Sequence, residues 1–143
     1  MQNLEIYLIV LLVLAGFIAS IAKNIKWKKK LQAGLKLKTK RGDNVQSRGE
    51  VIIADFLYDN NIKYIYDKPT RFSFFQPTSI RPDFYLPEYD IYIEYWGMRG
   101  NKNYDQKTEW KQKIYKKHNK KLINLYKEDK NNIPKILKQK LNL

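Results

Sequence analysis

The stretch RPDFYLPEYDIYIEYW, residues 81–96, decides how this chain folds. Its alternating side chains predict two short strands joined by a tight turn at Pro87-Glu88. One carboxylate, Asp83, stands near the start of the first strand, and another, Glu94, stands near the end of the second. A hairpin places these two positions side by side, so both acids are expected at one edge of a sheet.

Such a pair of acids has a chemical interpretation and a plain structural one. Two hard oxygen ligands at one point suit Mg²⁺, which also keeps waters and binds phosphate oxygens. Alternatively, Asp83 is an edge or turn acid and Glu94 faces solvent. Side chains alternate along a strand, so Glu94 lies on the same face as Tyr92. The apolar Phe84 directly after Asp83 indicates that the first strand continues into the core. We therefore favour chemistry on a phosphodiester.

Outward from the hairpin, the sequence pattern predicts three helices and two further strands. A helix is expected to open at Ser47-Arg48-Gly49-Glu50, and it is followed by a short strand before the hairpin. The predicted order of helix, strand, strand, strand, helix, strand, helix is that of an α/β fold with a mixed sheet flanked by helices. The additional elements are helix 51–59, strand 62–66, helix 104–119, strand 122–126 and helix 133–141.

Composition narrows the classes of function. The chain has 143 residues, no cysteine and one histidine, so it suits a single modest domain without disulfides or thiolate zinc sites. The lone His118 is a poor basis for a histidine zinc site or a Ser-His triad. The net charge of +14 indicates an anionic partner, either nucleic acid or an anionic membrane face.

Residues 6–22 read IYLIVLLVLAGFIASIA and contain no charge. At about 1.5 Å per residue they reach roughly 26 Å, slightly less than a hydrocarbon core of about 30 Å. We expect residues 1–24 to be a single-pass transmembrane anchor. A cleaved signal peptide and a buried core helix are the alternatives, although Met1–Glu5 lacks the basic start of a signal peptide.

A basic stretch follows the apolar segment. From Lys23 to Arg41 there are nine Lys or Arg residues and no acid. By the positive-inside rule, the C-terminal domain is expected in the cytoplasm and the N-terminus outside. Residues 25–45 are interpreted as a juxtamembrane linker lying on anionic headgroups, with a secondary nucleic-acid contact as the alternative.

From Gln46 to Asp129 the chain resembles the PD-(D/E)XK, or restriction-endonuclease-like, nuclease superfamily, in particular its small helicase-associated type of module. The resemblance implies a restriction-endonuclease-like core of α-β-β-β-α-β order in residues 46–143, after the N-terminal transmembrane helix. It is carried by Glu50, Pro82-Asp83, Glu94 with the following Gly97, Tyr104, Trp110-Lys111 and Leu122-Ile123.

The resemblance also implies a metal site and a catalytic set. Asp83 and Glu94 would bind Mg²⁺, with Mn²⁺ as a substitute, and Glu50 would add a third carboxylate directly or through water. Glu50 has a second interpretation, because Ser47-x-x-Glu50 matches a helix capping box. The two roles of Glu50 are compatible.

One position departs from the family pattern. Trp96 stands two residues after Glu94, where the family commonly has the catalytic lysine. The resemblance suggests a lysine supplied by the following helix instead. Lys111 is the best match, and Lys107, four residues earlier on the same helical face, is the second choice.

The expected function is a membrane-anchored, metal-dependent nuclease, a Mg²⁺-dependent endodeoxyribonuclease that hydrolyses phosphodiester bonds in DNA. Many proteins that it resembles work as dimers, so a homodimer is among the expected states. Trp96 motivates an alternative, a catalytically inactive nuclease-fold module that binds nucleic acid at the cytosolic membrane face. A third alternative is a membrane adaptor that holds anionic lipid or an acidic protein.

Overall fold

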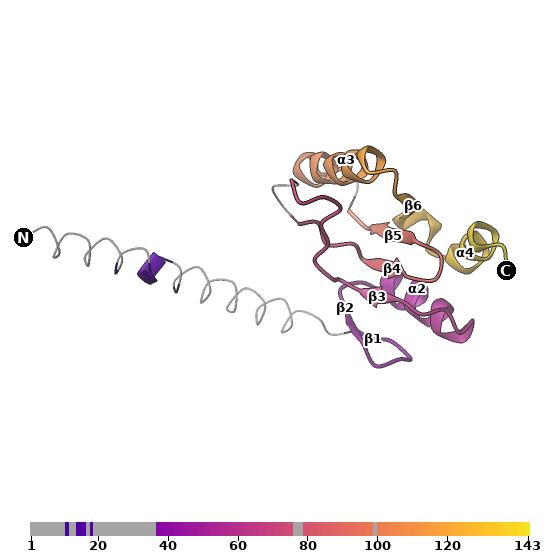
Figure 1. Cartoon of the computed structure of the whole chain (residues 1–143). Coiled ribbons are helices and arrows are strands. Elements are labelled where there is room, and N and C mark those ends of the chain that lie inside the picture. The colour runs from indigo at the N-terminus through magenta and orange to yellow at the C-terminus, as the bar shows by residue number, and fades with distance from the viewer. Residues whose placement is uncertain (1–10, 12–13, 17, 19–36, 76–78, 99) are drawn as a thin grey trace, which may run out of the picture. The chain divides into compact units, whose positions relative to one another are not determined.

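The structure is a computed structural model, in which Leu37–Leu143 form a compact unit (Figure 1). The predicted anchor, residues 1–24 with the apolar span 6–22, lies almost entirely outside the described residues. Among the residues that are described, no helix is both long and apolar enough to cross a bilayer. The described residues are 11, 14–16, 18, 37–75, 79–98 and 100–143.

A four-stranded mixed sheet forms the centre of the compact unit. Its strand order is β3-β4-β5-β6; the first two pairings are antiparallel, and β5 and β6 are parallel. This arrangement confirms the predicted mixed sheet in an α/β fold. The strands are β3 (Ile65–Tyr66), β4 (Phe84–Leu86), β5 (Ile91–Trp96) and β6 (Lys121–Tyr126).

Helices cover both faces of this sheet. Figure 1 shows α3 on one side of the strands, while α2 and α4 lie on the other. The order α2, β3, β4, β5, α3, β6, α4 is the order that the sequence predicts. The helices are α2 (Arg48–Asp59), α3 (Lys102–Lys117) and α4 (Ile133–Leu141), with a short 3₁₀ turn, η1 (Lys127–Asp129), after β6.

The compact unit begins with a small hairpin that the sequence pattern does not predict. Strands β1 (Leu37–Lys38) and β2 (Asn44–Val45) pair antiparallel. Val45 is fully buried, and the Lys40 amide donates a 2.8 Å hydrogen bond to the Asp55 carboxylate of α2. Residues 37–45, placed by sequence in the linker of residues 25–45, therefore pack with the domain.

The hairpin of β4 and β5 has the predicted pairing but a shorter first strand. Phe84 pairs with Ile93, and one step further along this register Asp83 stands opposite Glu94. Strand β4 starts only at Phe84 because Pro82 has no amide hydrogen for the ladder. The turn closes through Asp90, whose φ of 47° is left-handed.

The two faces of the sheet differ in what they bury. Against α2 and α4, Ile53, Leu57, Ile93 and Leu137 belong to one large apolar cluster and are all fully buried. Against α3, the apolar cluster consists of Ile80, Tyr92 and Tyr115, with partly buried neighbours. The buried charged side chains Glu94 and Lys111 are joined on the α3 side.

Candidate active site

A pocket of about 280 Å³ opens where the start of α2, the end of β5 and one face of α3 meet. We call it the site pocket. Its lining comes from four segments of the chain, residues 46–50, Asp83, residues 94–98 and residues 104–111. All four predicted site residues, Glu50, Asp83, Glu94 and Lys111, line it. The fold therefore brings together side chains from two helices and a hairpin that are far apart in the sequence.

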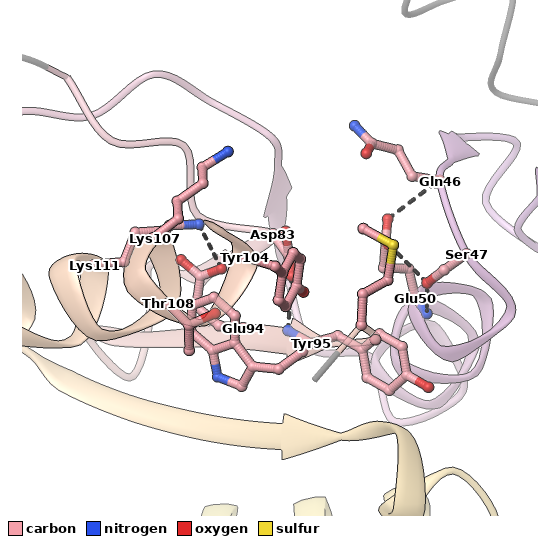
Figure 2. A pocket seen from close by; sticks show the side chains of 13 residues that line it. Gln46, Ser47, Glu50, Asp83, Glu94, Tyr95, Tyr104, Lys107, Thr108 and Lys111 are labelled. Atoms are coloured by element: carbon pink, nitrogen blue, oxygen red, sulfur yellow. Dashed lines mark hydrogen bonds and ion pairs between the residues drawn. The ribbon is translucent and has the colours of Figure 1, made fainter. Parts of the chain in front are cut away.

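Asp83 lies in the middle of the pocket, between Glu94 and Glu50, as Figure 2 shows. Its carboxylate is half-buried, and one oxygen accepts a 2.7 Å hydrogen bond from the Tyr95 amide. Burial raises the pKa of Asp83 well above its usual range, and the charge of Glu94 raises it further. The ammonium of Lys111 acts in the opposite direction without cancelling the shift. Asp83 therefore occupies a position where negative charge is poorly compensated.

Glu94 is only 1% exposed, so the solvent-facing interpretation of this residue is wrong. Lys111 Nζ donates to one of its oxygens at 2.6 Å, and Tyr115 Oη donates to the other at 2.7 Å. Burial raises the pKa of Glu94, although both donors pull it back down. Burial and the contact with Glu94 also raise the pKa of the Tyr115 phenol. A buried carboxylate with two strong donors is held in a fixed orientation.

Lys111 is the lysine that contacts one of the acids, Glu94. Its ammonium contacts Glu94, donates a second hydrogen bond to the Arg81 carbonyl at 2.8 Å, and is only 8% exposed. Lys107 also lines the pocket, but its side chain is exposed and extends away from the Glu94–Lys111 pair in Figure 2. The second-choice lysine thus stands at the mouth of the pocket.

Trp96 fills the position where the resemblance expects a lysine. The indole is 4% exposed, and its Nε1 donates to the Asn124 side chain on β6 at 2.8 Å. Lys111 Nζ lies 5.4 Å from the centroid of the Trp96 ring system. Trp96 is therefore part of the packing beneath the pocket, close to the ammonium that comes from α3.

Glu50 stabilises the start of α2, but its carboxylate accepts from the Gln46 amide and the Ser47 hydroxyl rather than from the Ser47 amide of the predicted capping box. Ser47 Oγ accepts from the Glu50 amide at 3.2 Å and donates to Glu50 Oε1 at 2.7 Å. The other carboxylate oxygen accepts from the Gln46 amide and from Tyr66 Oη, at 3.0 and 2.6 Å. Glu50 is 7% exposed and also lines the pocket. Its charge thus faces the site while its oxygens fix the start of α2.

Gly49 sets how closely α2 approaches β5. A Cβ at this position would overlap the far end of the Tyr95 ring, so the ring would have to move to admit any side chain. Tyr95 is the residue whose amide holds Asp83. Sequence reasoning missed the role of Gly49 and those of the Tyr66 and Tyr115 phenols. Tyr115 was detectable, because it lies four residues after Lys111 on the same helical face.

The chemistry of the pocket suits a divalent cation. Three carboxylates, those of Glu50, Asp83 and Glu94, line it, and one buried ammonium offsets them only in part. Carboxylate oxygens are the ligands that Mg²⁺ prefers. Within the described part of the chain, no three acidic or histidine side chains converge closely enough to make a complete metal site. Two acids would therefore need water or substrate oxygens to fill the coordination shell.

Comparison of the chain with protein-family models, with curated proteins and with solved structures found no match. The resemblance over residues 46–129 therefore stays a prediction from the sequence. What the protein does has to be argued from the pocket and its charges.

Proposed function

We propose that this protein is a metal-dependent nuclease that hydrolyses phosphodiester bonds, with DNA as its substrate, and that residues 6–22 hold it at the cytoplasmic face of a membrane. One observation carries the catalytic part of the proposal. Asp83 and Glu94 share one pocket with the ammonium of Lys111, which lies 2.6 Å from Glu94. Two acids and a lysine at one point are suited to phosphodiester hydrolysis.

Asp83 and Glu94 are the residues that would hold the cation, Mg²⁺ or Mn²⁺, with Glu50 as a contributor through water. When bound, a divalent ion neutralises charge on phosphate oxygens and acidifies water in its shell. The Tyr95 amide orients Asp83 for this role, and Tyr115 orients Glu94. Such supporting hydrogen bonds around the acids keep the site rigid before substrate arrives.

The ammonium of Lys111 would stabilise the negative charge that develops during hydrolysis. A water oxygen forms the new bond to phosphorus while the bond from phosphorus to the leaving sugar oxygen breaks. Charge grows on the phosphate oxygens and on the leaving oxygen, and a fixed cation in a water-poor pocket stabilises both. Because Lys111 is anchored by Glu94 and the Arg81 carbonyl, it needs no reorganisation at that moment.

The outer surface of α3 supports an extended anionic substrate. Its exposed lysines would contact successive phosphates of a nucleic acid strand and guide one phosphate into the pocket. Such contacts carry no base specificity and weaken steeply with salt. The exposed lysines on α3 are Lys102, Lys107, Lys113, Lys116 and Lys117.

One observation favours a second function, that of a nucleic-acid-binding module without catalysis. Both oxygens of Glu94 already have partners, in Lys111 and Tyr115. If these contacts persist when metal is offered, the site would bind phosphate without cleaving it. This alternative predicts salt-sensitive DNA binding and no cleavage by the unaltered protein.

The deciding experiment uses the full chain, purified in mild detergent, with labelled single-stranded, duplex and branched DNA and with RNA. Mg²⁺, Mn²⁺ and EDTA are compared. Asp83→Asn should abolish cleavage, while Glu109→Gln, which changes an exposed acid on α3 outside the pocket, should leave it intact. A folded protein that binds DNA but cleaves none of these substrates would favour the binding module.

A further inference from the structure

The face of α3 that lines the pocket carries one polar group that the proposed chemistry does not use. Tyr104, Lys107, Thr108 and Lys111 all line the pocket, in keeping with spacings of three and four residues along a helix. The hydroxyl oxygen of Thr108 is buried. Among the described residues, it is the one buried side-chain oxygen or nitrogen with no hydrogen-bond partner.

This lack of a partner is unusual for a threonine inside a helix. Such hydroxyls commonly bond back to the carbonyl four residues earlier, here that of Tyr104, but Thr108 makes no such bond. A buried hydroxyl without a partner destabilises the folded state. Valine has the same shape and a similar helix propensity, and it would fill this position without that cost. The hydroxyl is therefore expected to gain its partner from outside the chain.

The surroundings of Thr108 identify the chemistry of that partner. Its neighbour Lys107 and the residue three positions on, Lys111, line the same pocket, in which the Lys111 ammonium is paired with Glu94. With a divalent cation held by the acids, a ligand that binds beside these lysines carries negative charge. Because the Thr108 oxygen lacks an internal acceptor, its O–H is free to donate a hydrogen bond. A phosphate oxygen, anionic and rich in lone pairs, meets both requirements.

We infer that Thr108 is a substrate-binding residue whose hydroxyl donates to a non-bridging oxygen of the phosphodiester in the pocket. This inference rests on the proposed function and deepens it. A lysine ammonium attracts an anion in any orientation, whereas a hydroxyl held in place by the helix selects one orientation of the phosphate. Thr108 would thus align the phosphate for attack, while a cation held by Asp83 and Glu94 would supply most of the attraction.

The test separates binding from chemistry by working in the Asp83→Asn background, where cleavage does not obscure the equilibrium. The full chain in detergent is titrated against a fluorescently labelled short DNA duplex. Adding Thr108→Val should weaken binding about tenfold, the effect of losing a hydrogen bond to a charged group. Adding Thr108→Ser, which keeps the hydroxyl, should restore most of the affinity. The unfolding midpoint of Thr108→Val should stay unchanged or rise.

Thr39 offers a matched control. It is 7% exposed, its hydroxyl accepts a 3.1 Å hydrogen bond from the Asp43 amide, and it does not line the pocket. Thr39→Val should therefore show the opposite pattern, with a lower unfolding midpoint and unchanged affinity for DNA. The pair distinguishes a hydroxyl that serves the ligand from one that serves the fold.

Two results would overturn the inference. Equal DNA affinity with and without Thr108→Val would mean that the hydroxyl binds at most a water. A lower unfolding midpoint in both Thr108→Val and Thr108→Ser would mean a structural role. If the parent cleaves DNA and Thr108→Val changes neither binding nor rate, the role of Thr108 is refuted and the proposed nuclease function stands. If the parent never cleaves DNA but Thr108→Val still weakens binding, the proposed catalysis is refuted and the binding role of Thr108 stands.

Discussion

The two faces of the sheet bury different kinds of side chain. The face against α2 and α4 buries an apolar cluster in which Ile93 and Leu137 are fully enclosed. The face against α3 buries two charged side chains, Glu94 and Lys111, beside its smaller apolar cluster. Strand β5 serves both faces, because successive side chains point to opposite sides. The apolar core and the proposed site thus lie on opposite sides of one strand, and the effects of changes on the two sides should be separable.

The largest expected effect comes from changing Asp83 in the site pocket, which should leave the apolar cluster intact. Asp83→Asn should lower metal-dependent cleavage by roughly a thousandfold, about 4 kcal/mol in transition-state free energy. The amide oxygen can still accept from the Tyr95 amide, so the fold should remain. The measurement is the single-turnover rate at saturating Mg²⁺, beside circular dichroism. Cleavage at the parent's rate would remove Asp83 from the site.

The same variant should sharpen the comparison through pH. The pKa of Asp83 is raised in the folded state, so its contribution to stability is complete below its usual value of 3.8 and is lost as pH rises through the folded value. The neutral asparagine side chain of the variant has no such loss. The stability of Asp83→Asn relative to the parent should therefore increase from pH 4 towards neutrality, in urea titrations without metal. A constant difference would contradict the assigned burial.

A change on the apolar face should do the reverse. Leu137→Ala removes a fully buried side chain from the cluster against α2 and should cost about 3 kcal/mol of unfolding free energy. Cleavage by the folded molecules should be unchanged, because Leu137 does not line the pocket. Urea unfolding of residues 37–143, which have their own core, gives the first quantity. Slower cleavage by fully folded Leu137→Ala would show that the two faces of the sheet are coupled.

Gly49→Ala tests the close packing of α2 against β5, beside the amide that holds Asp83. The new methyl group would overlap the Tyr95 ring, so the variant should lose about 2 kcal/mol of stability despite the better helix propensity of alanine. Cleavage should also fall, because Tyr95 orients Asp83. A second change, Tyr95→Val, removes the ring and should recover part of the loss in a double-mutant cycle. A Gly49→Ala protein as stable as the parent would refute the close packing.

The smallest effect is expected from the Tyr115 phenol. Tyr115→Phe removes one donor to Glu94 and should cost about 1.5 kcal/mol. Because that donor lowers the pKa of Glu94, the variant's pKa should rise and the acidic limb of the pH–rate profile should move to higher pH. Tyr92→Phe, on the same face, changes a side chain that does not line the pocket and should leave that limb in place. An unmoved limb in Tyr115→Phe would contradict the assignment.

The sequence is most informative where local pattern decides structure. The hairpin of residues 81–96, the mixed sheet and the order of helices and strands follow from alternation, helical periodicity and turn residues. The family resemblance identifies Lys111, and Lys111 contacts Glu94. These features depend on spacing along one or two adjacent elements, which a sequence displays directly.

Contacts between distant segments are not predictable in this way. Tyr66 on β3 contacts Glu50 on α2, and nothing in the spacing of the two residues indicates this contact. Trp110 and Tyr115 are both large aromatic residues of α3, yet Trp110 is 43% exposed while Tyr115 is buried. The rotation of α3 on the sheet decides which apolar side chains are covered, and helical periodicity alone does not fix that rotation.

The parallel pairing of β5 with β6 also fixes the order in which the site can assemble during synthesis. Asp83 and Glu94 meet through a local hairpin, which closes fast once residue 96 has been made. Lys111 lies on the crossover helix, and its place is secured only when β6 docks beside β5. In a nascent chain the two acids, which repel each other, therefore meet before the Lys111 ammonium joins them. Completing the sheet is the step that completes the pocket.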